Sequence, residues 1–147
     1  MGIGADVLFR NGLAEAKVKY FDQTLETIIE LSKRHDLYIV TNGVTETQKR
    51  RLNQTPLHKY IKKIFISEET GYQKPNPEFF NYVFNDIGED ERQRSIIVGD
   101  SLTSDILGGI NAGIATCWFN FRGFDHNPGI IPDYEINSWK QLNDIVR

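Results

Sequence analysis

The chain has 147 residues, 39% of them apolar, which is enough for one domain with a buried core of ordinary size. Its 17 basic and 20 acidic side chains leave a formal charge of −3, so neither a nucleic-acid partner nor a membrane surface is indicated. A single cysteine excludes an internal disulfide, no apolar run reaches the roughly 18 residues of a membrane span, and the N-terminus lacks signal-peptide zones. These features predict a cytoplasmic protein that acts on small molecules.

The first predicted element is a helix before residue 37, with an apolar face that includes Leu25 and Ile28. Asp22 or Thr24 suits its N-cap, and Glu26 would complement the helix dipole. The alternative is that Asp22, in KYFDQTLE, is a catalytic nucleophile at the end of a strand. The preceding residues, AEAKVKY, carry three charges where a buried strand should be apolar, so we interpret Asp22 as a cap.

Four short runs rich in β-branched or aromatic residues follow, which is typical of strands buried on both faces: 37–40, 64–67, 95–99 and 116–120. Helical segments lie between them, including one at 79–87 that stops at Gly88 and one from Ile106 that stops at Gly113. A last strand at 134–137 and a helix capped by Ser138 end the chain. This alternation predicts an α/β fold, a Rossmann-like parallel sheet with helices on both faces.

Ligands of such sheets bind beyond the carboxyl ends of the strands. After the first run, Thr41, Asn42 and Gly43 offer a hydroxyl and two backbone N–H groups, which suit an anion, although a plain turn is an alternative. After the second run, Lys74 precedes Asn76, a suitable N-cap, and could place an ammonium at the rim of the sheet or be a solvated lysine.

The third run is followed by GDSLTSD, which contains two aspartates. Asp100 could ligate Mg²⁺, and Asp105 could hold a metal-bound water or orient Lys74; alternatively, both cap a helix. Threonine for phosphate, lysine for charge neutralisation and aspartates for magnesium are what a phosphoryl-transfer site needs. The three segments together therefore favour the functional interpretation.

The motifs TNG, YQKPNPEFF and VGDSLTSDILGGINAGIATCWFN resemble the second, third and fourth signature motifs of the haloacid dehalogenase-like hydrolases, over about 21–147. They are similar to the branch that includes pyrimidine 5′-nucleotidases. The resemblance implies that Thr41, with the N–H groups of Asn42 and Gly43, binds the transferring phosphoryl group. It also implies that Lys74 steadies the nucleophile and the phosphate. Asp100 would bind Mg²⁺ with support from Asp105, whereas Gly108 and Gly109 would only permit close helix packing.

The family's first motif, an apolar strand ending in Asp-x-Asp-x-Thr, is not found. We therefore expect residues 1–20 to be a remnant of a cap domain and 21–147 to be the core domain, with the first central strand and most of the cap missing. The chain would fill that slot with its own N-terminal residues, borrow a strand from another copy, or derive from a longer protein. Unpaired strand edges at such a gap would favour self-association.

The resemblance implies a magnesium-dependent phosphomonoesterase that acts on nucleoside monophosphates through an aspartyl phosphate in the full-length enzyme. This chain would be inactive by itself, because it lacks a recognisable nucleophile. Two alternatives stay open: a non-catalytic fragment or pseudoenzyme that binds phosphate and magnesium, and a dehalogenase or phosphomutase of the same superfamily.

Overall fold

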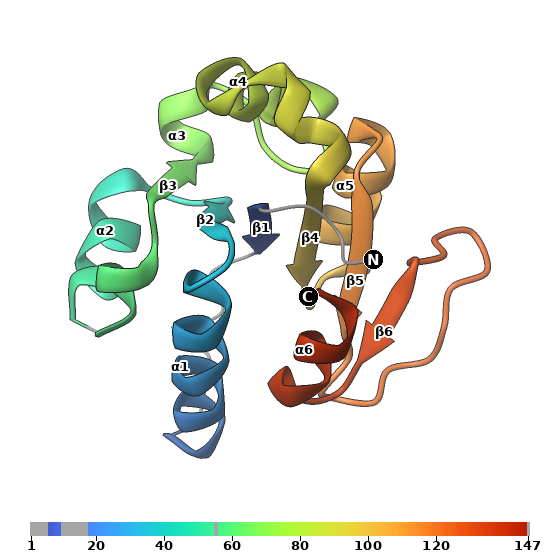
Figure 1. Cartoon of the computed structure of the whole chain (residues 1–147). Coiled ribbons are helices and arrows are strands. Elements are labelled where there is room, and N and C mark those ends of the chain that lie inside the picture. The colour runs from blue at the N-terminus through green and yellow to red at the C-terminus, as the bar shows by residue number, and fades with distance from the viewer. Residues whose placement is uncertain (1–5, 10–17, 55, 147) are drawn as a thin grey trace.

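The computed structural model describes residues 6–9, 18–54 and 56–146, which form a six-stranded parallel sheet with helices on both faces (Figure 1). The sheet order is β3-β2-β1-β4-β5-β6. The strands are β1 (Asp6–Phe9), β2 (Asp36–Thr41), β3 (Lys63–Ile66), β4 (Ser95–Gly99), β5 (Ala115–Phe119) and β6 (Tyr134–Ile136). The predicted α/β fold is confirmed.

The helices alternate with the strands, as the sequence predicts. They are α1 (Val18–Ser32), α2 (Thr45–Asn53), α3 (Ser67–Thr70), α4 (Pro77–Ile87), α5 (Leu107–Ala112) and α6 (Leu142–Ile145). The shorter helical turns are η1 (Pro56–Tyr60), η2 (Glu89–Arg94), the π-helical η3 (Leu102–Ile106) and η4 (Trp139–Gln141). The helix α3 and the turn η2 were not predicted, because SEET and EDERQR contain no apolar side chain and hence no helical spacing.

Strand β1 occupies the centre of the sheet. It pairs in parallel with β2, from Asp6 opposite Asp36, and with β4, from Asp6 opposite Ser95. The expectation of a missing central strand is therefore wrong: of the three alternatives, the chain's own N-terminal residues fill the slot. The sequence DVLF suits this place because three of its four residues are apolar. The gap that motivated self-association is absent from the described sheet.

The division of the chain at residue 20 changes accordingly. Residues 6–9 lie in the core sheet and residues 18–20 begin α1, so these residues are part of the core domain. Residues 1–5 and 10–17 lie outside the described residues, and their assignment to a cap remnant remains a prediction.

Helix α1 begins at Val18, so the prediction that Asp22 or Thr24 caps its start is wrong. Asp22 is the fifth residue of the helix. The preceding AEAKVKYF contains neither glycine nor proline and is rich in good helix formers, so nothing in it stops the helix at Asp22. Asp22 lies inside α1 and not at the end of a described strand, which disfavours the nucleophile alternative.

Side chains that alternate along the strands build two apolar clusters, one on each face of the sheet. In β2, Leu37 and Ile39 belong to one cluster, and Tyr38 and Val40 belong to the other. Helices α1 and α6 cover the first face and α4 covers the second; Figure 1 shows α1 and α6 at the bottom and α4 at the top. Burial of each large apolar side chain contributes about 1.5–3 kcal/mol. The clusters hold the strand ends in fixed positions.

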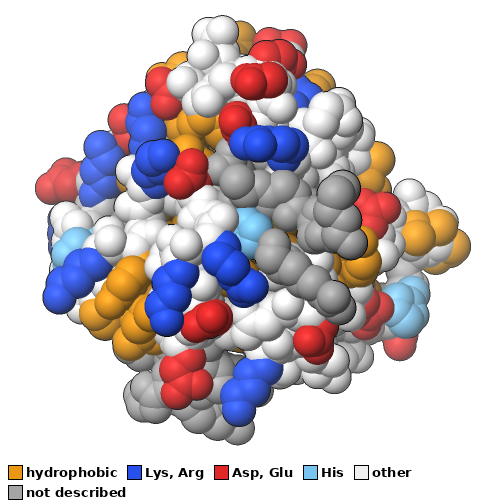
Figure 2. Space-filling view, in the orientation of Figure 1, with side chains coloured by type: hydrophobic (Ala, Val, Ile, Leu, Met, Phe, Trp, Pro, Cys, Tyr) orange, Lys and Arg blue, Asp and Glu red, His pale blue; other side chains and the backbone are white. Residues whose placement is uncertain are grey.

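None of the described helices combines the length and the apolar character that crossing a bilayer requires. On the face shown in Figure 2, basic and acidic side chains are interspersed, as the balanced composition predicts.

Cys117 lies in β5 with no exposed surface, and burial raises the pKa of its thiol to about 12. The thiol is therefore protonated at pH 8, whereas the thiolate is the species that reacts. We expect iodoacetamide to leave Cys117 unmodified in the folded protein at pH 8 and to modify it in denaturant, as measured by intact mass. Rapid modification without denaturant would contradict the burial.

Candidate functional site

The carboxyl ends of β2, β3 and β4 lie at one edge of the sheet, because these strands are parallel. The segment 41–43 ends and follows β2, Lys74 follows β3 and α3, and the segment 100–105 follows β4. The structure joins all three at Lys74, through hydrogen bonds with Asn42 and an ion pair with Asp105. The candidate site is this edge.

Lys74 is the centre of these contacts and is not a solvated lysine. Its Nζ lies 2.5 Å from Asp105 Oδ1 and donates to the Val40 carbonyl oxygen at 3.0 Å. The side chains of Lys74 and Asp105 are both 0% exposed. A buried ion pair persists only where further hydrogen bonds offset the desolvation of its charges. The pair fixes the segment after β3 against the segment after β4.

Asp105 engages both of its carboxylate oxygens. Oδ1 contacts Lys74, and Oδ2 accepts from the Ser101 N–H at 3.2 Å. Of the roles predicted for Asp105, the orientation of Lys74 is the one whose contact the structure contains. The two aspartates therefore differ: Asp105 is buried and paired at the base of the loop, whereas Asp100 lies nearer to the surface.

Two glycines permit the close approach of these segments. A Cβ on Gly99 would lie 2.4 Å from Asp105 Oδ2, so any larger residue collides with the carboxylate. A Cβ on Gly108 would lie 3.3 Å from the Pro75 Cα, next to Lys74. The close packing predicted for Gly108 is confirmed, and so is that of Gly109, whose added Cβ would lie 2.6 Å from Ile97 Cγ2. The requirement for Gly99 was missed, because it depends on a side chain six positions away.

The Asn42 side chain joins the first segment to Lys74. Its Nδ2 donates to the Lys74 carbonyl oxygen at 3.1 Å, and its Oδ1 accepts from the Lys74 N–H at 2.9 Å. The sequence predicts only a backbone role for Asn42. No local pattern reveals the side-chain role, because the partner lies 32 residues along the chain.

Thr41 and Gly43 are the sequence neighbours of Asn42. Thr41 ends β2, is 2% exposed and donates from its hydroxyl to the Asn42 carbonyl oxygen at 3.1 Å. The Gly43 N–H donates to Ser67 Oγ at 2.9 Å, so one of the two N–H groups predicted to bind phosphate is engaged within the chain. The Gly43 backbone has a φ of 151°, a value that residues other than glycine rarely adopt.

Asp100 pairs with Arg122, a residue that was not among the predicted site residues. Its Oδ2 accepts from an Arg122 guanidinium nitrogen at 3.2 Å, and its carbonyl oxygen accepts from the Trp118 indole N–H at 3.1 Å. The Asp100 side chain is 12% exposed and lines a cavity of about 330 Å³. Arg122 was missed because the many turn formers of the loop 120–133 favour the interpretation of a plain connecting loop.

The oxygen atoms around Asp100 suit a magnesium ion that takes few ligands from the protein. Among the described residues, no three His, Cys, Asp or Glu side chains are placed to hold a metal ion together. Magnesium needs fewer protein ligands, because it binds one or two carboxylates and keeps several waters and phosphate oxygens. Asp100, next to the hydroxyls of Ser101 and Thr103 in the same cavity lining, can supply such a ligand.

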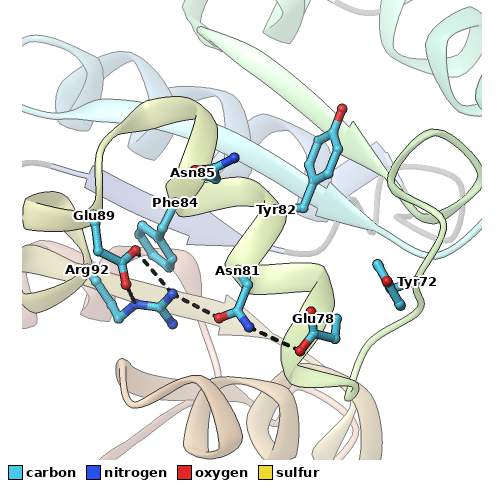
Figure 3. A pocket seen from close by; sticks show the side chains of 8 residues that line it. All are labelled: Tyr72, Glu78, Asn81, Tyr82, Phe84, Asn85, Glu89 and Arg92. Carbon is cyan, nitrogen blue, oxygen red and sulfur yellow. Dashed lines mark hydrogen bonds and ion pairs between the residues drawn. The ribbon is translucent and has the colours of Figure 1, made fainter.

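A second cavity, of about 480 Å³, lies over α4 and contains none of the predicted site residues (Figure 3). Its polar side chains bond with each other: Arg92 donates to Glu89 at 2.9 Å and to Asn81 at 3.0 Å. Arg92 also stacks 4.7 Å from the Phe84 ring centroid. These contacts hold Arg92 in place against Glu89, Asn81 and Phe84, and Asn81 in turn donates to Glu78 at 3.3 Å.

Comparison with known proteins confirms the resemblance seen in the sequence. The family model for haloacid dehalogenase-like hydrolases matches residues 8–119. The HAD-hydrolase YfnB of Bacillus subtilis is 47% identical over 125 residues, which cover 85% of this chain and 53% of YfnB. The pyrimidine 5′-nucleotidase YjjG of Escherichia coli is 43% identical, covering 74% of this chain and 48% of YjjG. The pyrimidine 5′-nucleotidase PynA of Streptococcus pneumoniae is 39% identical, over 83% of this chain and 51% of PynA.

A solved structure agrees with these relatives. The crystal structure of YfnB bound to magnesium matches with a TM-score of 0.81 and 48% identity, over 84% of this chain and 54% of that chain. The chain thus spans about half the length of the relatives it matches.

Proposed function

The chain belongs to the haloacid dehalogenase-like hydrolase family, and we propose that it carries the phosphate- and magnesium-binding parts of a phosphomonoesterase that acts on nucleoside monophosphates. The observation that carries the proposal is the buried Lys74–Asp105 pair, held on one side by Asn42 and on the other by Ser101. These contacts unite three loops at one sheet edge, which is where a transferring phosphoryl group can be bound from several sides.

Thr41, Asn42 and Lys74 form the phosphate side of the proposed site. The Asn42 N–H donates to phosphoryl oxygens, the Thr41 hydroxyl does so once it leaves the Asn42 carbonyl oxygen, and the Lys74 ammonium offsets the negative charge of the phosphate. The Gly43 N–H contributes once it exchanges its bond with Ser67. A charge held in a water-excluded site interacts more strongly than in solvent and needs no reorganisation during the reaction. Lys74 meets this condition because Val40 and Asp105 hold its fully buried ammonium.

Asp100 forms the metal side, with Asp105 in support. A bound magnesium ion supplies charge stabilisation and orientation to the phosphoryl group. Asp100 presents a carboxylate whose orientation Arg122 fixes. The Asp105 carboxylate accepts a hydrogen bond from the Ser101 N–H, which keeps the first residues after β4 in place.

The reaction also needs a nucleophile. The central strand β1 is followed in the sequence by RNGLAEAK, which contains no aspartate, where the family motif is Asp-x-Asp-x-Thr. We therefore propose that the aspartyl phosphate forms in a full-length enzyme and that this stretch does not hydrolyse substrate by itself. The same observation favours the alternative of a non-catalytic protein that binds phosphate and magnesium.

Phosphate release from nucleoside 5′-monophosphates, with and without magnesium, tests both sides of this proposal. We expect no release by this chain, and magnesium-dependent release by a longer protein in which an Asp-x-Asp motif precedes the same residues. Release by this chain that Asp22→Asn abolishes would show instead that KYFDQTLE is catalytic. A longer protein that binds phosphate without turnover would favour the non-catalytic alternative, and magnesium-independent loss of halide from a haloacid would favour the dehalogenase.

The role of Asp100 can be tested by binding alone. We expect Asp100→Asn to weaken Mg²⁺ binding in the presence of inorganic phosphate at least about 10-fold, as measured by isothermal titration calorimetry, because the amide lacks the negative charge of the carboxylate ligand. Asp90→Asn is the matched control, since Asp90 is exposed in η2, before β4. Equal Mg²⁺ affinities of Asp100→Asn and the parent chain would remove Asp100 from the metal site.

A further inference from the structure

We propose that the cavity beside Asp100 binds the planar base of the phosphate ester's leaving group, with Phe124 as the surface on which the base stacks. The inference rests on the proposed function and names the part of the site that recognises the substrate. The cavity has a volume of about 330 Å³, within the range of small-molecule sites. Its lining combines residues 100–103 after β4 with Trp118, Arg122 and Phe124 from β5 and the loop that follows.

Phe124 is exposed but firmly held. The Phe124 residue is 56% exposed, so burial of its apolar surface contributes little to its position. Its backbone is instead fixed by Asn120, which accepts from the Phe124 N–H at 2.8 Å and donates to the Phe124 carbonyl oxygen at 2.9 Å. An exposed apolar ring on a fixed backbone is a partly preorganised contact surface, since no backbone entropy is lost when a ligand packs on it.

Asn120 is itself well anchored. It directly follows β5, is 7% exposed, and its Nδ2 also donates to Glu135 Oε2 at 3.0 Å. Its N–H donates to the Ile136 carbonyl oxygen at 2.8 Å. The position of Phe124 is therefore set by the edge of the sheet, and not by the loop alone.

Arg122 connects this surface to the metal side of the site. Its guanidinium carbon lies 4.5 Å from the Phe121 ring centroid and 5.8 Å from the Phe124 ring centroid, at distances typical of cation–π contacts. The same guanidinium reaches Asp100 at 3.2 Å. A base stacked on Phe124 is thus adjacent to the residue that would hold the metal beside the substrate phosphate.

The polar groups of the lining indicate the kind of base. The Arg122 guanidinium is a pure donor, and the hydroxyls of Ser101 and Thr103 can also donate. The Asp100 carboxylate of the same lining accepts, so the lining favours a ring that carries acceptor oxygens together with an N–H donor. A dioxopyrimidine has two carbonyl oxygens and a flat face, so it suits both the donors and the Phe124 ring.

The test compares the affinities of three ligands for the chain in the presence of Mg²⁺: uridine 5′-monophosphate, ribose 5-phosphate and inorganic phosphate. We expect the base to tighten binding about 10-fold over ribose 5-phosphate, the size of effect that base–aromatic stacking gives. Phe124→Ala should abolish this preference and leave the affinity for inorganic phosphate unchanged. Ile131→Ala is the matched control, because Ile131 lies in the same loop, is 72% exposed and does not line the cavity.

The outcomes separate the inference from the proposed function. Equal affinities for uridine 5′-monophosphate and ribose 5-phosphate, or a preference that survives Phe124→Ala, would overturn the base site while the phosphate site stands. A loss of preference in Ile131→Ala as well would overturn the specific role of Phe124. Failure of inorganic phosphate to bind would overturn the proposed function, and the base site with it.

Discussion

Lys74→Met is expected to lower the free energy of unfolding by about 3–5 kcal/mol, because it leaves the Asp105 carboxylate buried without its counter-charge. Methionine has a similar shape, so the loss is electrostatic and not a packing defect. The Asp105 side chain is 0% exposed and cannot turn to solvent, and the Val40 carbonyl oxygen loses the Lys74 ammonium as a donor. Urea denaturation, followed by tryptophan fluorescence, measures the change.

Two controls identify the cause of that loss. The double variant Lys74→Met with Asp105→Leu should recover most of the stability, because replacing both charges of a buried pair by apolar groups is close to neutral. Lys63→Met removes an ion pair with Asp86 whose side chains are 51% and 42% exposed, and it should cost less than about 1 kcal/mol. A change below about 1 kcal/mol for Lys74→Met would contradict the buried pair.

Gly99→Ala is expected to lower the free energy of unfolding by about 1–3 kcal/mol, the usual cost of forcing extra atoms into a packed core. The added Cβ would lie 2.4 Å from Asp105 Oδ2 and 2.5 Å from the Asp105 Cβ. Asp105 cannot move aside without losing its contacts with Lys74 or Ser101. We also expect weaker binding of inorganic phosphate, because Lys74 shifts with its partner; calorimetric titration measures this effect.

Gly129→Ala is the matched control for Gly99. There the added Cβ would lie 3.3 Å from the Asn127 side-chain oxygen, which belongs to an exposed loop residue and can move. Its effect should stay within about 0.5 kcal/mol, as for most surface substitutions. An unchanged free energy of unfolding for Gly99→Ala would show that the end of β4 tolerates a side chain and that Asp105 is not packed against Gly99.

The sequence by itself determined the elements whose signals are local. The apolar runs of β2, β3, β4 and β5 identify buried strands, since a strand covered on both faces needs apolar side chains throughout. Asn76 marks the start of α4, and the structure confirms the cap: Asn76 Oδ1 accepts from the Glu78 N–H at 2.8 Å. The order of these elements and the three motifs at the strand ends also sufficed to identify the family.

The tertiary structure decided whatever depends on partners distant in the sequence. From the sequence, the segment DVLF is interpreted as part of a cap remnant because the family resemblance begins at about residue 21, and only its pairing with β2 and β4 makes it the centre of the sheet. The same holds for the side-chain contacts of the site: Asn42 meets Lys74 across 32 residues, and Arg122 meets Asp100 across 22. Capping and hydrophobic periodicity act within a few residues, whereas such contacts arise only when packing has brought separate strand ends to one edge.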